Sequence, residues 1–340
     1  MPCIVPPTPR VARKRIADDK VRAVRLRLPI QRRPYLLAVV VFLVLCAINV
    51  GLQPTFLRFG VAVSNLASFL PIALVAVGQT YVVLASDIDL SAGAIVSVVN
   101  VVVVSIIEGM GGTGASIAVG LAAGLALGIA CGVFNGLCVA VLRFQPIVTT
   151  FATGIVFSGF ALWVLPEAGK QVPASVYTAY AGAVVGVPTV IWILAAAVAF
   201  AAAVGRSRFY QALRATGGNM QAAYQTGLAV ARVRVGAYAI SGVFASLAGL
   251  ALVGETASGD PLIGGALTLS SVTAVVLGGT ALSGCVGGVA GSILGAFILG
   301  LINNVIFFAQ LPFEWQGLVQ GVIILLALAG GVVMARGRTD

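Results

Sequence analysis

Ten long apolar stretches, almost free of charge, constrain this 340-residue chain more than any other feature. They fall at 35–53, 61–85, 89–107, 114–142, 146–165, 188–205, 235–254, 264–283, 285–309 and 316–335. A helix needs about 20 residues to cross the roughly 30 Å apolar core of a bilayer. Only 9% of the residues are charged, against roughly 25% in an average soluble domain. The pattern excludes an ordinary water-soluble enzyme and predicts an all-α, polytopic bundle of about ten transmembrane helices, surrounded by membrane lipid.

The basic residues are concentrated at the amino-terminal end, where ten of the 20 lysines and arginines precede the first apolar stretch. We expect residues 1–34 to form a mostly disordered cytoplasmic extension. A nucleic-acid-binding tail is the alternative, but no aromatic residue for base stacking lies among the basic ones. The stretch 35–53 could also be a signal-peptide core, but no small-x-small cleavage site follows it cleanly. We therefore expect a retained first helix and no nucleic-acid partner.

The remaining charges test the helix count and the orientation. With ten spans and a cytoplasmic amino terminus, 18 basic residues fall on the inner side and only Arg58 and Lys170 on the outer side. Because basic loop residues stay in the cytoplasm, this split predicts that both termini are cytoplasmic. The membrane domain is then 35–335, its longest inner loop is 206–234, and 336–340 is a short inner tail.

Residue types that perform catalysis are scarce. The chain has no histidine, which is the commonest general base and metal ligand, and its five cysteines include no C-x-x-C pair. No carboxylate or basic residue falls near the middle of a predicted span, which disfavours a proton-coupled carrier. We expect no catalytic residue, no metal and no cofactor, and an intramembrane enzyme lacks the nucleophile or metal set that it would need.

Glycine recurs at every fourth residue in two of the apolar stretches. The positions are Gly120, Gly124, Gly128, Gly132 and Gly136 in the fourth stretch, and Gly287, Gly291 and Gly295 in the ninth. In lipid, missing side chains let helix backbones approach each other closely. Four residues turn a helix by about 400°, so such a stripe winds around its helix. We expect these glycines to pack helices together, with a glycine-lined solute path as the alternative.

Two carboxylates stand where the second apolar stretch meets the third. Asp87 and Asp89 are placed to cap free N–H groups and to complement the positive end of the third helix. Asp89, Gly93, Ser97 and Asn100 then share one helical face. A small, polar face faces either a partner helix or a water-filled path. Asp87, Asp89, Ser97 and Asn100 are therefore candidates both for capping and packing and for a gate or solute path.

A short internal echo relates two segments of the chain. The triplet VVL at 82–84 precedes Leu-Ser and a glycine, and the triplet VVL at 275–277 also precedes Leu-Ser and a glycine. Both segments lie at the inner ends of spans that run in the same direction in the predicted topology. The echo favours a parallel repeat, which transporters use, although a match this short also arises by chance.

The loop 206–234 contains a helix signal. Asn219 is a favourable N-cap, about two turns of helix-forming residues follow, and Gly227 is a typical stop. Ala222 and Ala223 give this helix a smooth surface that suits a partner's groove. An interfacial helix anchored by the flanking arginines is the alternative.

Four separated stretches, taken in order, are similar to a known family. They are GQTYVVLASDIDLSAGA (78–94), FNGLCVAVLRFQPIVTTFATG (134–154), YQALRATGGNMQAAYQTGL (210–228) and VTAVVLGGTALSGCVGGVAGSILGAFILGLINN (272–304). They resemble the permease subunits of ribose- and galactose-type ATP-binding-cassette (ABC) sugar importers, and the similarity covers nearly everything after residue 35.

The resemblance implies a subunit of the bacterial inner membrane that works with three partners. These are a second permease subunit, cytoplasmic ABC ATPase subunits and an extracytoplasmic solute-binding protein. In the family, a GGN-x-x-AA-x-x-x-G segment forms the cytoplasmic coupling helix. It corresponds here to Gly217, Gly218, Asn219, Ala222, Ala223 and Gly227. The chain has no G-x-x-x-x-G-K-[ST] phosphate loop, so ATP hydrolysis is expected in a partner.

Some positions depart from the family pattern. Thr268, Leu269 and Ser270 stand where many relatives carry a Glu-Leu-Asp run, and Cys285 and Val286 replace a common glycine and a common arginine. The solute is therefore less well defined than the fold. A monosaccharide is expected, and a nucleoside or another small polyol-like molecule is the alternative. A stand-alone secondary carrier or channel is the rival function.

Overall fold

The computed structural model describes residues 35–310, 312, 315, 317–318 and 321–322. The predicted basic extension (1–34), the predicted tail (336–340) and most of the tenth apolar stretch lie outside the described residues. The helices are α1 (Tyr35–Leu52), α2 (Phe59–Leu84), α3 (Ala92–Gly109), α4 (Gly114–Ala140), α5 (Pro146–Val164), α6 (Ala174–Ala181), α7 (Thr189–Gly205), α8 (Arg208–Gly218), α9 (Met220–Gln225), α10 (Val230–Thr256), α11 (Gly265–Leu277) and α12 (Val289–Phe308).

Strands are short and peripheral. β1 (Lys170–Gln171) pairs antiparallel with β4 (Ser258–Gly259), and β2 (Ala183–Val184) pairs antiparallel with β3 (Val187–Pro188). The predicted all-α membrane bundle is therefore confirmed.

Six described helices, α2, α3, α4, α5, α10 and α12, are long and apolar enough to cross a membrane. A seventh span is present if α7 and α8, which meet at an angle of 73°, count as one broken span. α1 and α11 are shorter apolar helices; α11 has 13 residues, about 20 Å at 1.5 Å per residue, which is less than the apolar thickness of a bilayer. Each of the first nine predicted stretches thus contains a helix. The count of ten spans and the side of each terminus stay predictions.

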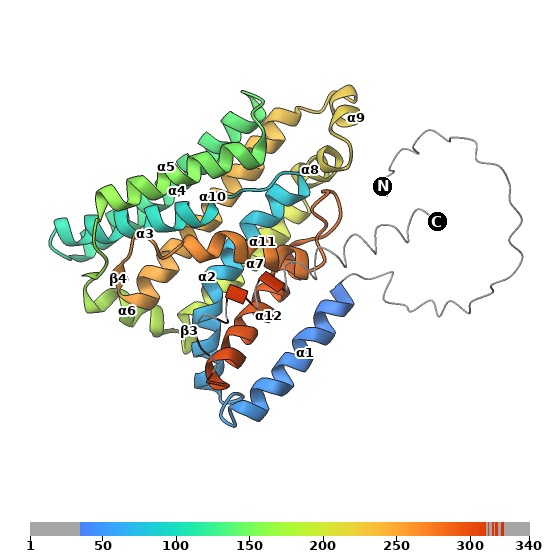
Figure 1. Ribbon diagram of the computed structural model, residues 1–340. Coiled ribbons are helices and arrows are strands. Elements are labelled where there is room, and N and C mark those ends of the chain that lie inside the picture. The colour runs from blue at the N-terminus through green and yellow to red at the C-terminus, as the bar shows by residue number, and fades with distance from the viewer. Residues whose placement is uncertain (1–34, 311, 313–314, 316, 319–320, 323–340) are drawn as a thin grey trace, which may run out of the picture.

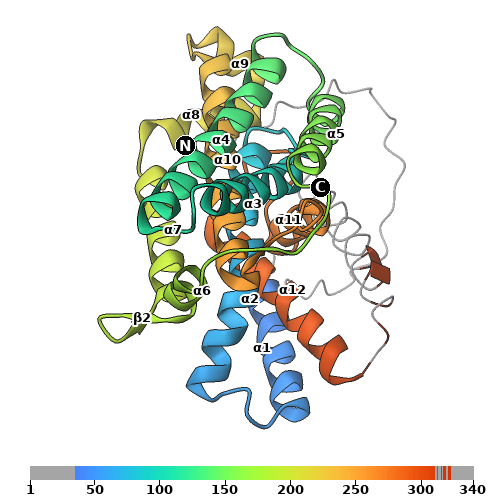
Figure 2. The ribbon, with the colours of Figure 1, turned by 90° about the vertical axis from the view of Figure 1, so that its left-hand side faces the viewer.

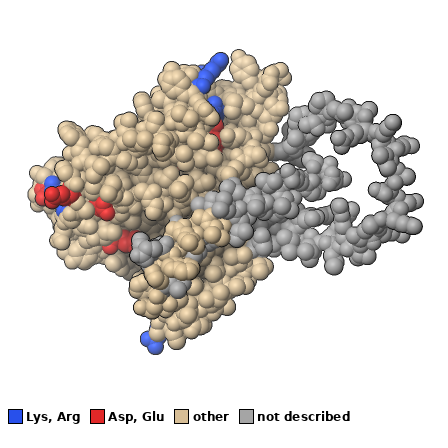
Figure 3. Space-filling model, in the orientation of Figure 1, with Lys and Arg blue, Asp and Glu red and all other residues tan. Residues whose placement is uncertain are grey.

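α10 lies at the centre of the bundle and packs against α2, α3 and α4 (Figure 1, Figure 2). α11 and α12 pack on α2, and α1 packs on α12 at the periphery. Large buried side chains at the centre include Leu74 of α2, Ile95 of α3 and Phe244 of α10. Charged side chains gather at the ends of the face seen in Figure 3 and leave a broad uncharged belt between them. Such a belt suits contact with lipid.

The glycines of α4 change partners along the helix. Gly120 and Gly124 face α3, and Gly128, Gly132 and Gly136 face α10. A Cβ atom at Gly132 would overlap the Tyr238 carbonyl, and one at Gly128 would overlap the Ser246 hydroxyl. The stripe therefore winds from one neighbour to the other, as a four-residue period requires. These contacts support the packing role that the sequence predicts for the stripe, which substitution can test.

The glycines near α12 divide into two groups. Gly291 and Gly295 lie on α12 and face α11, where a Cβ atom at Gly291 would overlap the Gly278 carbonyl. Gly287 was expected inside the ninth helix, but it lies two residues before α12 begins and has a φ of +129°. Its backbone conformation favours glycine and does not fit a helix. Gly287 therefore belongs to the loop between α11 and α12.

Candidate coupling site at the α9 end of the bundle

α8 and α9 form a bent unit at one end of the molecule (Figure 1). The Ser207 hydroxyl accepts a hydrogen bond from Tyr210 N at 3.2 Å and begins α8. Asn219 Oδ1 accepts from Ala222 N at 2.9 Å and begins α9. α9 ends just before Gly227, whose φ of +82° suits a helix stop. The helix that the sequence predicts between Asn219 and Gly227 is present.

α9 exposes most of its surface. Ala223, which was expected on the smooth surface of this helix together with Ala222, is instead buried at 4% exposure, because it faces the bundle. Tyr224 is 73% exposed and Met220 is 38% exposed. Ala222 and Gly218 are exposed as well. A short helix at the tip of the molecule thus presents apolar groups with one alanine as its buried base.

Gly217, at the end of α8, rests directly on backbone. A Cβ atom at this position would overlap the Leu84 carbonyl and would lie 3.0 Å from Cys285 N. Leu84 ends α2 and leads into the loop 85–91, and Cys285 belongs to the loop 278–288 between α11 and α12. We call the contact of Gly217 with these two loops the junction. Any larger residue at position 217 would force the junction apart.

Three hydrogen-bond donors, Cys285 N, Arg214 Nε and the Ser86 hydroxyl, hold the junction together. Cys285 N donates to the Leu84 carbonyl at 3.2 Å, and Arg214 Nε of α8 donates to the Cys285 carbonyl at 2.9 Å. The Ser86 hydroxyl lies 2.8 Å from the Gly217 carbonyl and 2.8 Å from the Ser283 carbonyl. The two loops that meet here are the ones related by the VVL echo in the sequence.

A buried ion pair fixes the loop 85–91 to α10. Arg234 Nε and Nη2 each donate to the Asp87 carboxylate at 2.8 Å, and Arg234 Nη1 lies 3.5 Å from the Val139 carbonyl of α4. The Asp87 side chain is 3% exposed and the Arg234 side chain 11% exposed. Burial raises the pKa of the Asp87 carboxyl, and the hydrogen bond and charge of Arg234 counteract that rise. Asp87 thus holds α10 and does not cap α3.

Asp89 is fully buried and accepts three hydrogen bonds. Its donors are Ser91 N at 2.9 Å, the Ser91 hydroxyl at 2.6 Å and the Ser241 hydroxyl of α10 at 3.0 Å. With its amide oriented to match donors with acceptors, Gln79 pairs with the Asp89 backbone at 3.1 and 3.2 Å. Asn135 of α4 donates to the Ser91 hydroxyl at 2.6 Å. Burial raises the pKa of Asp89, and the bonds from Ser91 and Ser241 oppose the rise.

Ser97 and Asn100 lie further along α3 and contact a different segment. The Ser97 hydroxyl accepts from Gly264 N at 2.9 Å, and Asn100 Oδ1 accepts from Asp260 N at 2.8 Å. Both side chains are buried, at 2% and 0% exposure. They fasten α3 to the segment that leads into α11, whereas Asp87 and Asp89 lie at the junction end. The four candidates thus do not meet in one site, and their role as a gate or solute path stays a prediction.

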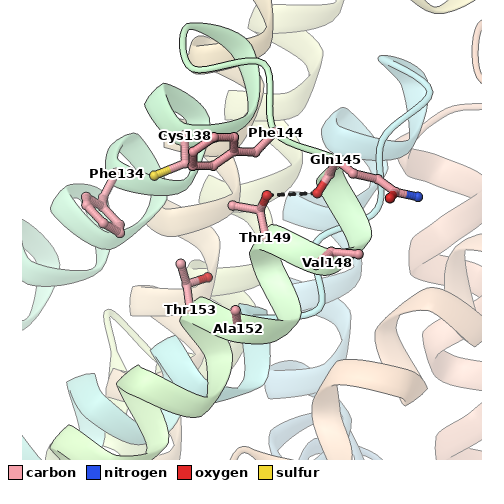
Figure 4. Close-up of a pocket in the computed structure, with 8 residues that line it drawn as sticks. All are labelled: Phe134, Cys138, Phe144, Gln145, Val148, Thr149, Ala152 and Thr153. Carbon is pink, nitrogen blue, oxygen red and sulfur yellow. Dashed lines mark hydrogen bonds between the residues drawn. The ribbon is translucent and has the colours of Figure 1, made fainter.

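A cavity of about 450 Å³ opens between α4 and α5 (Figure 4). Its lining residues are Phe134, Cys138, Phe144, Gln145, Val148, Thr149, Ala152 and Thr153. The Thr149 hydroxyl donates to the Gln145 carbonyl at 2.8 Å, so its proton is already in use. The lining is mainly apolar, and its neighbours on α5 are strongly exposed, as Ile155 at 61% and Val156 at 66% show. This face suits lipid or a partner helix.

Residues 61–328 match the family described as branched-chain amino acid transport system / permease component. The chain belongs to this family. The permease is 33% identical over 299 residues to the ribose import permease protein RbsC of Escherichia coli (strain K12). The aligned region covers 86% of this chain and 91% of that protein. The permease is 34% identical over 282 residues to RbsC of Bacillus subtilis (strain 168), covering 82% and 86%. No solved structure matches.

A third relative widens the group. The autoinducer 2 import system permease protein LsrC of Escherichia coli (strain K12 / DH10B) is 31% identical over 257 residues, covering 75% of this permease and 74% of that protein. The resemblance to import permeases is therefore confirmed. The relatives of this chain are transport permeases. The chain itself is a multi-pass protein of the bacterial inner membrane.

Sequence reasoning found the glycines and Asn219 of the proposed coupling segment but missed three residues at this end of the bundle, namely Ser86, Arg214 and Arg234. Arg234 was assigned to the loop 206–234, because hydropathy windows exclude charges, yet α10 begins at Val230 and carries it inward. Ser86 carried no signal except its place beside Asp87. Arg214 was one of several arginines in a loop, and only its contact with the Cys285 carbonyl distinguishes it.

Proposed function

We propose that this permease subunit imports a monosaccharide or a related small polyhydroxylated solute with energy from partner ATPases. It works with a second permease subunit, cytoplasmic ABC ATPase subunits and an extracytoplasmic solute-binding protein. The observation that carries this proposal is the unit of α8 and α9, in which α9 exposes apolar side chains and Gly217 of α8 rests on two loops of the bundle. The names of the relatives, import permeases for ribose and autoinducer 2, support the class of solute.

α9 is the proposed docking element for the ATPase. Gly217, Gly218, Asn219, Ala222, Ala223 and Gly227 form the proposed coupling segment, and Met220 and Tyr224 add exposed apolar surface. Closure of the ATPase subunits around ATP moves α9, and the junction passes the displacement to α2, α3, α11 and α12. The bundle then shifts between outward-open and inward-open states as a rigid-body switch. In this proposal α9 and both termini lie on the cytoplasmic side, as the distribution of basic residues predicts.

The buried charges favour a neutral solute over an amino acid. A zwitterion inside the bundle needs opposite charges as partners, because burying an unpaired charge is costly. Among the described residues, the buried charges Asp87 and Arg234 neutralise each other, and the third buried charge, Asp89, is already bound by hydrogen bonds from Ser91 and Ser241. Uncharged groups such as the Ser270 hydroxyl and the Asn303 amide, whose Oδ1 has no hydrogen-bond partner among the described residues, match the hydroxyls of a sugar instead. The family description names branched-chain amino acids, so a direct comparison of leucine with sugars decides this point.

A bulky substitution on α9 tests the docking role. Ala222 is exposed, so Ala222→Trp leaves packing inside the chain intact. We expect this variant to insert normally and to lose at least 90% of the ATPase stimulation by solute-loaded binding protein. Leu142→Trp in the loop between α4 and α5, at a residue 57% exposed and beside Arg143 on the predicted inner side, is the control and should keep full stimulation. Normal stimulation in Ala222→Trp would refute docking through α9.

A further inference from the structure

The Ser86 hydroxyl has one proton and two acceptors. It lies 2.8 Å from the Gly217 carbonyl of α8 and 2.8 Å from the Ser283 carbonyl of the loop 278–288. A serine hydroxyl donates one hydrogen bond, so the two carbonyls compete for it. Ser86 has a φ of +66°, a conformation that serine seldom adopts, and this aims its side chain between the two carbonyls. Gly284 beside it leaves room, since a Cβ atom there would overlap the Ser86 hydroxyl.

The loop that carries Ser86 is fixed, whereas α8 and α9 have breaks at both ends. The bonds that Arg234 donates to Asp87 and Ser241 donates to Asp89 hold the loop 85–91 on α10. α8 follows a 73° bend after α7, and α9 is followed by Gly227 at a φ of +82°. A load on α9 therefore moves α8 relative to Ser86 more easily than it moves Ser86 relative to α10.

We infer that Ser86 is a positioning residue that couples α8 to the two loops of the junction by exchanging its hydrogen bond between the Gly217 and Ser283 carbonyls. With α8 seated, the proton goes to the Gly217 carbonyl and the bond from Ser86 to the Ser283 carbonyl is given up, while the bond from Cys285 N to the Leu84 carbonyl stays. With α8 withdrawn, the proton goes to Ser283 and ties the loop 85–91 to the loop 278–288. The position of α8 thus sets how firmly α2 and α3 are joined to α11 and α12.

This inference rests on the proposed function and specifies how the motion of the coupling helix reaches the bundle. Arg214 supplies the complementary attachment, because its bond to the Cys285 carbonyl keeps α8 on the loop 278–288. Ser86 is exposed and Gly217 is buried, so water can reach the Ser86 hydroxyl but not the contact between Gly217 and the Leu84 carbonyl. A hydroxyl in this position can change acceptors without breaking core packing.

The test measures the number of solute molecules imported per ATP in proteoliposomes that contain the complete importer. The probe is whichever of D-ribose, D-galactose and adenosine the wild-type importer takes up. We expect Ser86→Ala and Ser86→Gly to lower this ratio roughly two- to tenfold, the factor that one net hydrogen bond gives. The ratio does not depend on how much complex assembles, so a merely structural defect leaves it unchanged. Glycine also suits the φ of position 86, which protects folding.

Two controls remove hydroxyls that make no hydrogen bond within the described part of the chain. Thr216→Val acts at the junction itself, and Ser105→Ala acts in α3; both hydroxyl oxygens are buried without a partner among the described residues. Both variants should keep the wild-type ratio. An unchanged ratio in Ser86→Ala and Ser86→Gly would overturn the role of Ser86, and so would failure of Ser86→Gly to assemble, since the hydroxyl would then serve folding. Failure of the wild-type importer to transport any probe would instead overturn the proposed function.

Discussion

At the scale of single residues, the Asp87–Arg234 pair shows why the partners of the charged side chains could not be predicted from the sequence. The carboxylate was predicted to cap α3, but the guanidinium that binds it lies 147 positions away in the chain. Hydropathy periodicity carries no information about such a distant partner. The positions of Asn219 and Gly227 were predicted because helix caps and stops are local signals, whereas Gly217 was indicated only by the resemblance to the family. The geometry of the candidate site was therefore predictable where it depends on local backbone, and hidden where it depends on pairing across the bundle.

Removing one member of this pair should destabilise the protein strongly. Asp87→Ala leaves the Arg234 guanidinium buried without its partner, which costs about 3–5 kcal/mol. We expect a lower unfolding temperature in detergent, followed by tryptophan fluorescence, and partial recovery in the double variant Asp87→Ala/Arg234→Met. Glu108→Ala is the control, because its ion pair with Lys170 is solvent-exposed and such pairs contribute about 0–1 kcal/mol. Equal effects of Asp87→Ala and Glu108→Ala would contradict this account.

At the scale of helices, the four-residue glycine period predicted a winding stripe but could not name its neighbours. α4 uses the stripe first against α3 and then against α10, and only the three-dimensional arrangement shows where the change occurs. Helix ends were less predictable than helix centres. α11 ends at Leu277, six residues before the predicted boundary, because the loop 278–288 needs glycines with positive φ at 279, 284 and 287. An apolar window does not register such a loop when its residues are small and uncharged.

The stripe predicts a difference between two glycine substitutions. Gly132→Leu would drive a side chain into the Tyr238 carbonyl of α10, whereas a Cβ atom at Gly159 on α5 would meet no packed neighbour within 4 Å among the described residues. Overpacking of this kind costs about 1–3 kcal/mol or more. We expect Gly132→Leu to lower the yield of folded protein from membranes several-fold, measured by gel-filtration chromatography, while Gly159→Leu keeps the wild-type yield. Equal yields would show that close packing of α4 on α10 is unimportant.

At the scale of the whole molecule, the fold class and the family followed from the sequence, because both depend on features spread along the chain. Nine of the predicted apolar stretches contain a helix, and four separated motifs indicated the family before any contact was known. The two segments of the VVL echo lead into loops that meet at the junction, where the Ser86 hydroxyl of one loop lies 2.8 Å from the Ser283 carbonyl of the other. The proposed function needs a partner ATPase, since the sequence has no G-x-x-x-x-G-K-[ST] phosphate loop, and α9 is the proposed place where that partner docks.

The central claim is that this permease moves solute only when partner ATPases act on α9. The most direct measurement is uptake of radiolabelled D-ribose, D-galactose or adenosine by proteoliposomes that contain either the permease alone or the permease with its ATPase, its binding protein and ATP. The account predicts accumulation against a gradient in the complete system and none with the permease alone. Accumulation by the permease alone would contradict it.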